Sequence, residues 1–192
     1  MLIDPGDEVA ELLALPIGKT STIRHILLTH AHVDHVTGVA SAKRALGVPV
    51  YLHRDDLFLY ERAVDIGRDV RTAGRTAAAD RRASTRPDKP IAFGNFTSHA
   101  GITRRVTVRA AYACRLAGTA TAGKDLFVGD TLFAGSIGRT DLTGRRPSGA
   151  DRLDPQRTLR ASATTRSVHP GHGPTTTIER ERRTNPFLTG NA

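Results

Sequence analysis

The sequence predicts an α/β fold, in which strands and helices alternate along the chain. Residues 22–53 contain an apolar run, a histidine-rich loop, a segment with helical spacing that ends at Gly47, and a second apolar run. This order is typical of a β-α-β unit. Another strong strand is expected in "KDLFVGDTLFAG", residues 124–135. Together these patterns predict layers of helix packed on sheet.

The remaining elements are shorter. "MLID" followed by "PGDE" indicates the end of a strand and a turn, and Val9, Leu12 and Leu13 share one face of a helix that ends at Pro16. Residues 54–65 predict a short helix, and residues 106–118 can form a strand. The chain closes with a strand end, a turn and a short helix in residues 167–188.

Composition indicates a soluble protein with a single domain over residues 1–192. Hydrophobic residues make up 39% and charged residues 24%, and no run reaches the ~20 apolar residues of a membrane span. The acidic start lacks the charged leader of a signal peptide. Cys114 is the only cysteine, which excludes a disulfide framework and favours the cytoplasm.

The net charge of +9 comes mainly from arginine. These arginines do not form one stripe, and few aromatic residues accompany them for base stacking. We therefore expect neither a nucleic-acid partner nor a membrane partner. The oligomeric state is left open.

The stretch "LLTHAHVDHVTG", residues 27–38, places four metal-ligand side chains in six positions. Imidazole and carboxylate together suit zinc, iron or manganese. His30 and His32 are two residues apart and face one side of an extended backbone, whereas Asp34 and His35 follow where a helix begins. The geometry favours two adjacent metals. Further ligands are expected downstream, and Asp130 and His172 are the candidates.

These motifs resemble the metallo-β-lactamase superfamily. "THAHVDH" matches its T-H-x-H-x-D-H signature, and "GDTLFAGSIGRTDL" and "PGHGPTTTIERERRTNPFL" resemble its glyoxalase II-like (hydroxyacylglutathione hydrolase-like) branch. The resemblance implies an αββα sandwich with the metals at one edge, between the two sheets. It also implies metal ligands at the motif positions: His30 and His32 for the first metal, Asp34, His35 and His172 for the second, and Asp130 for both.

The resemblance further implies a metal-bound hydroxide as the nucleophile, with Asp34 orienting it as the catalytic residue. Asp4, in "IDPGD", resembles the family's acidic turn beneath the site. Arg139 and Asp141 form either a substrate-facing loop or a structural pair.

The sequence departs from the family pattern in three places. A further family histidine, in a "PGHTxGS"-like turn, is missing; its aligned position is near Val108, and His99, in a short Gly-containing turn, is the candidate substitute. The chain starts inside a strand, so the first strands of that sheet are expected to be absent. Residues 68–112 and 145–166 match poorly and have the composition of loop or disorder. Either paired frameshifts in GC-rich DNA or ordinary divergence accounts for these two segments.

The resemblance implies that the protein is a metal-dependent hydrolase that cleaves a small thioester, such as an acylglutathione. It would use one or two zinc ions, and iron is the alternative metal. A second interpretation keeps the fold but makes the protein an iron-dependent persulfide dioxygenase, whose mononuclear site uses two His and one Asp. A third interpretation is a degenerate, non-catalytic remnant that binds metal weakly.

Overall fold

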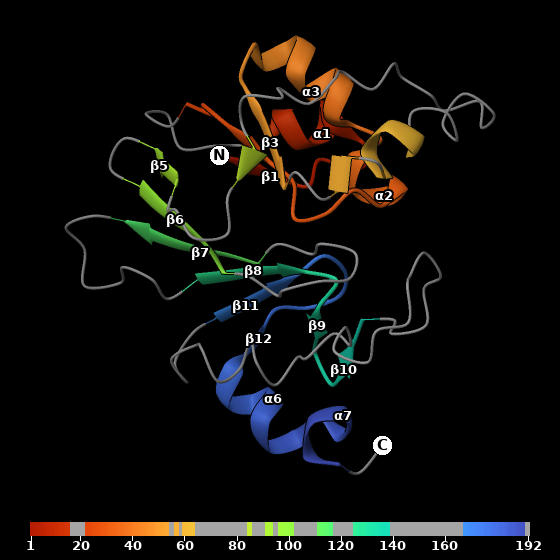
Figure 1. Cartoon of the computed structure of the whole chain (residues 1–192), viewed down its shortest axis with the longest axis vertical. Helices are drawn as coiled ribbons and strands as arrows, with labels where there is room; N and C mark the ends of the chain where they lie inside the picture. Colours follow the sequence, from red (N-terminus) through yellow and green to blue (C-terminus); the bar gives the residue numbers. More distant parts are fainter. Residues whose placement is uncertain are drawn as a thin grey trace. The chain divides into compact units, whose positions relative to one another are not determined.

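The computed structural model describes residues 1–15, 22–53, 56–57, 59–63, 84–85, 91–93, 96–101, 111–116, 125–138 and 167–190 (Figure 1). The chain divides into two compact units, Met1–Thr85 and Arg86–Ala192. Each unit contains its own sheet, and each is described separately below.

The first unit is built on a parallel sheet with the strand order β1-β2-β3-β4. Its strands are β1 (Leu2–Ile3), β2 (Ile26–Leu27), β3 (Val50–His53) and β4 (Ser84–Thr85), and its labelled helices are α1 (Val9–Ala14), α2 (Val33–Val36) and α3 (Val39–Leu46). The predicted β-α-β unit is confirmed, because α2 and α3 connect the parallel pair β2 and β3. Gly47 ends α3 at φ 65°, with its N–H donating to the Lys43 carbonyl.

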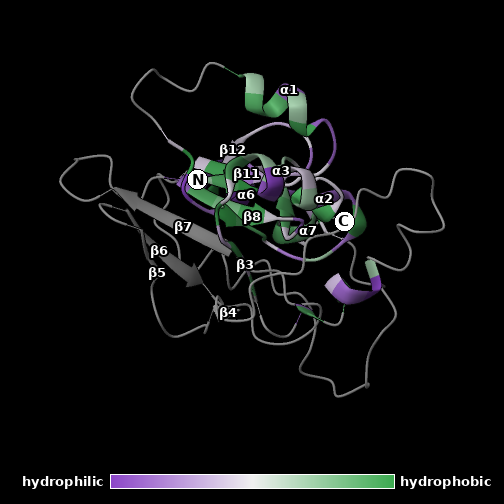
Figure 2. Ribbon diagram, turned by 90° about the horizontal axis from the view of Figure 1, so that it is seen from above, coloured by the Kyte–Doolittle hydropathy of each residue, from purple (hydrophilic) through white to green (hydrophobic). Residues whose placement is uncertain are grey.

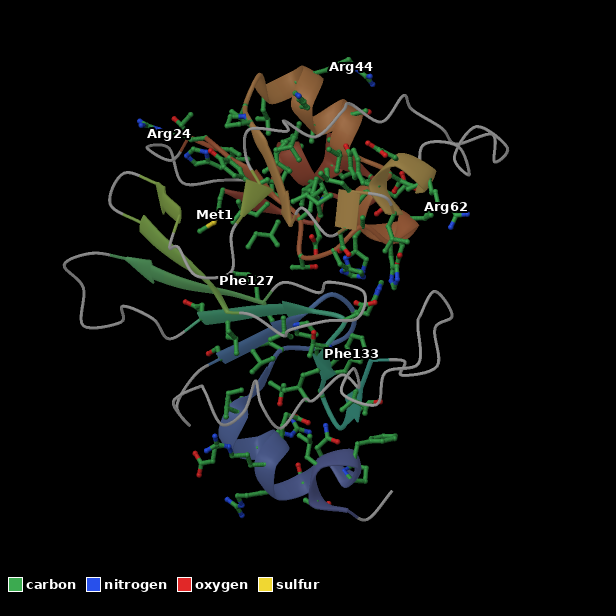
Figure 3. The ribbon with its side chains drawn as sticks, viewed as in Figure 1. Met1, Arg24, Arg44, Arg62, Phe127 and Phe133 are labelled. Atoms are coloured by element: carbon green, nitrogen blue, oxygen red, sulfur yellow. The ribbon has the colours of Figure 1, made fainter. Side chains whose placement is uncertain are left out.

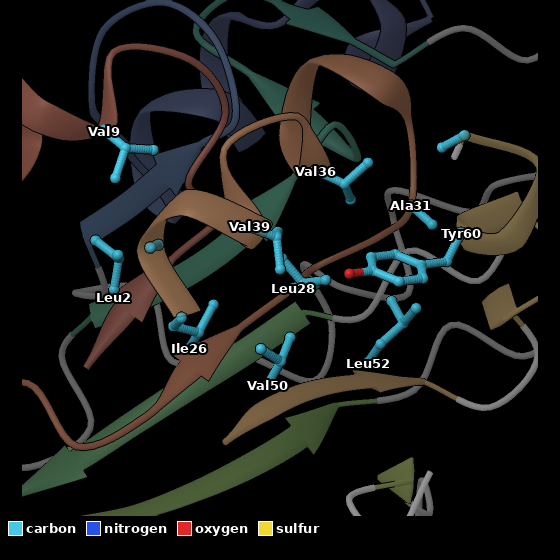
Figure 4. Close-up of a cluster of buried hydrophobic side chains, with 12 residues drawn as sticks. Leu2, Val9, Ile26, Leu28, Ala31, Val36, Val39, Val50, Leu52 and Tyr60 are labelled. Carbon is cyan, nitrogen blue, oxygen red and sulfur yellow. The ribbon is translucent and has the colours of Figure 1, made fainter. Parts of the chain in front are cut away.

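The core of the first unit lies against this sheet (Figure 4). Ile26, Val39 and Val50 are fully buried, as expected for a parallel sheet with covered faces. The predicted short helix is also present, with helical residues at 56–57 and 59–63, and it contributes Tyr60 to the same cluster. Helix α1 lies largely on the hydrophobic side of the colour scale in Figure 2, and it buries Val9.

The described arginine side chains of the first unit lie on its surface. Arg24, Arg44 and Arg62 are exposed and extend away from the ribbon (Figure 3). Arg44 donates a hydrogen bond to Ser41 on the same helix. Among the described residues, no helix combines the length and the apolar character needed to cross a bilayer.

Burial of Tyr60 leads to a pH-dependence prediction. Desolvation raises the pKa of its phenol from 10.0 to about 12. Because the folded-state pKa lies above the unfolded value, the stabilisation is fully present below pH 10 and is lost as the pH rises toward 12. Two pKa units correspond to about 3 kcal/mol. Urea unfolding between pH 9 and 12 should show this loss, and Tyr60→Phe should reduce it; an equal loss in both proteins would contradict the assignment.

The second unit contains a six-stranded mixed sheet with the order β12-β11-β8-β7-β6-β5. Only β8 and β11 pair in parallel. Its elements are β5 (Ile91–Phe93), β6 (Phe96–Gly101), β7 (Ala111–Leu116), β8 (Asp125–Gly129), the hairpin strands β9 (Leu132–Phe133) and β10 (Ser136–Ile137), β11 (Ser167–Pro170), β12 (Thr176–Thr177), α6 (Ile178–Thr184) and α7 (Pro186–Thr189).

A small apolar cluster holds the second unit together. Leu126, Val128, Leu132, Val168 and Ile178 are buried in it. Helix α6 starts where the Thr177 side chain accepts a hydrogen bond from the Arg180 amide. Helix α7 follows immediately and ends at Gly190.

The structure corrects part of the loop prediction for residues 68–112. Strands β4, β5 and β6 and the first residues of β7 lie in this range, and the rest of it is outside the described residues. Residues Phe96 to Gly101 pair in register with Leu116 to Ala111. A backbone ladder of this kind does not require an apolar period, which explains why the composition failed to indicate it. The whole of 145–166 lies outside the described residues.

Candidate metal centre

The histidine cluster follows the carboxyl end of β2. Leu28 extends the pairing beyond the strand, because its amide donates to the Tyr51 carbonyl at 2.8 Å. His32 keeps an extended backbone at the start of α2, and Asp34 and His35 occupy the first turn of that helix. The open end of a parallel sheet is the usual place for a ligand site in α/β proteins.

Asp4 is the centre of the hydrogen-bond network below the cluster. Its side chain is only 10% exposed. One carboxylate oxygen accepts from the Thr29 amide at 2.6 Å, and the other accepts from the Thr29 hydroxyl at 2.5 Å and lies 3.0 Å from His35 Nδ1. Because a carboxylate only accepts, Nδ1 of His35 carries the proton and donates it. The lone pair of the neutral His35 ring is then on Nε2.

The same network determines the tautomer of His30. Its Nδ1 lies 3.0 Å from the Thr29 hydroxyl oxygen. Since Thr29 uses its own proton on Asp4, this oxygen accepts from His30 Nδ1. The Nε2 atom of His30 therefore carries the lone pair, as it does in His35. Both buried imidazoles present the nitrogen that a metal requires.

Two pairs of these donor atoms each have the spacing of two ligands of one ion. Ligand atoms of a tetrahedral zinc, with bonds of about 2.0–2.1 Å, lie roughly 3.3 Å apart. His30 Nε2 is 3.0 Å from His32 Nδ1, and His35 Nε2 is 3.6 Å from an Asp34 oxygen. The ring centroids of His30 and His35 are only 4.1 Å apart. The first unit thus brings together all four residues of the predicted cluster.

Two glycines allow the Asp4 turn to pack directly on the helix that carries the cluster. A Cβ atom at Gly6 would overlap the carbonyl oxygen of Asp34, and one at Gly38 would overlap that of Gly6. The Gly38 amide also donates to the Pro5 carbonyl at 3.1 Å. Backbone contact between the turn and the helix is what places Asp4 next to His35.

Gly38→Ala is expected to destabilise the protein strongly. Its methyl group would lie against backbone oxygens that cannot rotate away, so the cost should reach or exceed the upper end of the ~1–3 kcal/mol of ordinary overpacking. Gly47→Ala is the control: its site is open, and the positive φ alone costs about 1 kcal/mol. Urea unfolding compares the two. A Gly38 variant no less stable than the Gly47 variant would refute this packing argument.

The second unit brings Asp130 and His172 together. Asp130 follows β8 and His172 lies in the turn after β11, and the two parallel strands are joined at this end by a 2.8 Å hydrogen bond from the Gly171 amide to the Gly129 carbonyl. An oxygen of Asp130 is 3.7 Å from His172 Nε2. A carboxylate and an imidazole at this separation again have the spacing of two ligands of one ion.

The other residues singled out from the sequence are placed differently. His99 is not in a turn: it lies within β6, opposite Ala113 of β7. Val108, Arg139 and Asp141 lie outside the described residues.

Comparison with known proteins identifies the family of these motifs. Residues 1–172 match the sequence profile of the Metallo-beta-lactamase superfamily. The uncharacterized protein Rv2581c of Mycobacterium tuberculosis (strain ATCC 25618 / H37Rv) is 34% identical over 201 residues, which cover 99% of this chain and 87% of the relative. Hydroxyacylglutathione hydrolase GloC of Haemophilus influenzae is 27% identical over 207 residues, which cover 97% and 86%.

A solved structure is similar over almost the whole chain. The crystal structure of TTHA1623 in a di-iron-bound form has 38% sequence identity and a TM-score of 0.70, and the match covers 97% of this chain and 88% of that one. The metal bound in that crystal structure is iron, whereas the motifs alone suit zinc equally well.

Proposed function

This chain belongs to the metallo-beta-lactamase superfamily, a family of metallo-hydrolases, and on that premise we propose that it is a metal-dependent thioester hydrolase of the glyoxalase II-like type. The observation that carries the metal part of the proposal is the set of Nε2 lone pairs on His30 and His35, which Asp4 and Thr29 direct. The thioester part is supported by the similarity to a hydroxyacylglutathione hydrolase.

We assign the ligands as the family resemblance implies. His30, His32 and Asp130 would hold one ion, and Asp34, His35 and His172 the other, with Asp130 shared. A bound zinc or iron ion lowers the pKa of its water toward ~7 and polarises a carbonyl group. The Asp34 side chain is 56% exposed, so that a carboxylate oxygen is accessible for orienting that water. If no residue replaces the missing family histidine, we expect fewer than two ions per chain.

The proposed substrate is a small acylglutathione or a similar acyl-thiol. Glutathione thioesters are anionic, and a protein with a net charge of +9 attracts such a substrate over a distance. The exposed arginines of the first unit contribute to this field.

The test combines metal analysis with three assays on the purified protein. Elemental analysis after gel filtration gives the metal and its stoichiometry. The same sample is then assayed with an acylglutathione, with a chromogenic cephalosporin, and with a persulfide under oxygen monitoring. We expect one to two ions per chain and hydrolysis of the thioester.

Each of the other outcomes would assign the protein a different function. Oxygen consumption by an iron-loaded protein would make it a persulfide dioxygenase, and cephalosporin turnover alone would make it a β-lactamase. A monodisperse protein without metal that remains inactive after incubation with zinc or iron would be a non-catalytic remnant.

A further inference from the structure

Glu181, on helix α6, is a fully buried carboxylate that joins three parts of the second unit. One of its oxygens accepts from the Thr176 hydroxyl at 2.5 Å. The other accepts from the Gly135 amide at 2.9 Å and from the Asn185 side-chain amide at 2.8 Å. Asn185, which is also fully buried, donates in addition to the Ser136 carbonyl at 3.0 Å. Neutral donors thus satisfy both oxygens of the carboxylate.

One arm of this network ends on the segment that carries Asp130. The hairpin β9–β10 starts two residues after Asp130, and its base is closed by a hydrogen bond from the Gly138 amide to the Thr131 carbonyl. Glu181 and Asn185 hold the bend of that hairpin, through Gly135 and Ser136 respectively. The position of the hairpin determines where the chain leaves β8, and hence where Asp130 lies.

The other arm ends on the segment that carries His172. The turn containing His172 connects β11 to β12, and Thr176 is the first residue of β12. The Thr176 hydroxyl therefore anchors the far end of the turn to Glu181. The near end is held by the Gly171–Gly129 hydrogen bond. Glu181 consequently connects, through one carboxylate, the two segments that bear the ligand candidates of this unit.

We propose that Glu181 is a positioning residue that sets the separation between Asp130 and His172, and through it the metal affinity of the second unit's half of the site. This inference rests on the proposed metal-dependent function. A carboxylate that served only the core could be replaced by an apolar side chain, whereas a side chain that holds two loop segments needs a hydrogen-bonding atom directed at each of them.

Three substitutions separate positioning from general stability. Glu181→Gln preserves the network, because its carbonyl oxygen accepts from Gly135 and Asn185 while its amide donates to the Thr176 oxygen. Glu181→Ala removes every acceptor. Thr176→Val is a milder, isosteric change that disconnects only the arm to the His172 turn. Glu179→Gln, at an exposed position on the same helix, is the matched control.

Two readouts apply to each protein. The first is titration of the metal-free protein with Co²⁺, followed by its visible absorption. The second is the crystal structure of each metal-free protein, which gives the distance from Asp130 to His172. We expect Glu181→Ala to lower Co²⁺ affinity by ~10–100-fold, as is usual for the loss of groups that orient metal ligands, and to lengthen that distance. Glu181→Gln and Glu179→Gln should match the unsubstituted chain.

The outcomes are separable. Unchanged affinity and an unchanged Asp130–His172 distance in Glu181→Ala would overturn the inference, even if that variant were less stable. If Glu181→Ala does not fold, the Thr176→Val variant tests the inference instead. A Co²⁺ affinity and an Asp130–His172 distance equal to those of the unsubstituted chain would then overturn the inference. If the unsubstituted chain itself binds no Co²⁺, the proposed function fails, while the metal-free structures still decide the positioning role.

Discussion

Asp130→Asn is expected to abolish most of the proposed thioesterase activity while leaving the fold intact. The substitution keeps the shape of the side chain but removes the negative charge that lies 3.7 Å from His172. Loss of groups that merely orient metal ligands costs ~10–100-fold in affinity or activity, so the loss of the proposed shared ligand should exceed that range in kcat/KM. Metal content per chain should fall in parallel.

The control for this variant lies on the same strand. Asp125→Asn makes the same chemical change at the other end of β8, where the carboxylate pairs with His169 on the exposed surface. An exposed pair of this kind contributes ~0–1 kcal/mol, and activity should not change. The measurements are kcat/KM, metal content and the urea midpoint of both variants. An Asp130→Asn protein that retains full metal and activity would remove Asp130 from the site.

Local patterns accounted for what the sequence predicted well. The elements β2, α2, α3 and β3 follow one another directly along the chain, and the four ligand candidates lie within six positions, so spacing alone indicates which side chains share a face. Gly47 at the end of α3 is a further local signal that the structure confirms. Pairings between distant residues have no such signal, and they account for most of what was missed.

Thr29 shows this limit clearly. The motif match includes Thr29 but assigns it no role. Its hydroxyl nevertheless connects His30 to Asp4, which lies 25 residues before Thr29 in the chain. Glu181 shows it again, because a charged residue on a short helix is ordinarily on the surface. A signal was nevertheless present: Ile178, Glu181 and Asn185 are spaced i, i+3, i+7 and share the buried face.

Strands β5 and β6 were missed for another physical reason. They are defined by backbone pairing, with Ile91 opposite Ser98 and Phe96 opposite Leu116. Register between such strands is a property of the folded sheet, and composition alone does not reveal it.

Asp4→Ala is the substitution expected to damage both stability and metal binding. It leaves the Thr29 amide, the Thr29 hydroxyl and His35 Nδ1 without their acceptor in a largely buried site. Each unsatisfied buried group costs ~1–3 kcal/mol, so a loss of about 3 kcal/mol or more in the free energy of unfolding is expected. The change also frees Thr29 to donate to His30 Nδ1, which moves the His30 proton to Nε2, the atom that should hold the metal.

Two further variants separate these effects. Asp7→Ala removes an exposed carboxylate of the same turn that accepts from the Glu8 amide, and should cost little. Asp4→Asn is more informative, because asparagine tolerates the positive φ of 45° but has one oxygen and a donating amide. It cannot satisfy all three donors: with its oxygen placed between the Thr29 hydroxyl and His35 Nδ1, its amide faces the Thr29 N–H, and in the reverse orientation the oxygen accepts from the Thr29 N–H alone. We therefore expect Asp4→Asn to recover part of the stability and little of the metal affinity, measured by urea unfolding and Co²⁺ titration. Full recovery of both would mean that the carboxylate acts only as a structural acceptor and does not direct the two imidazoles.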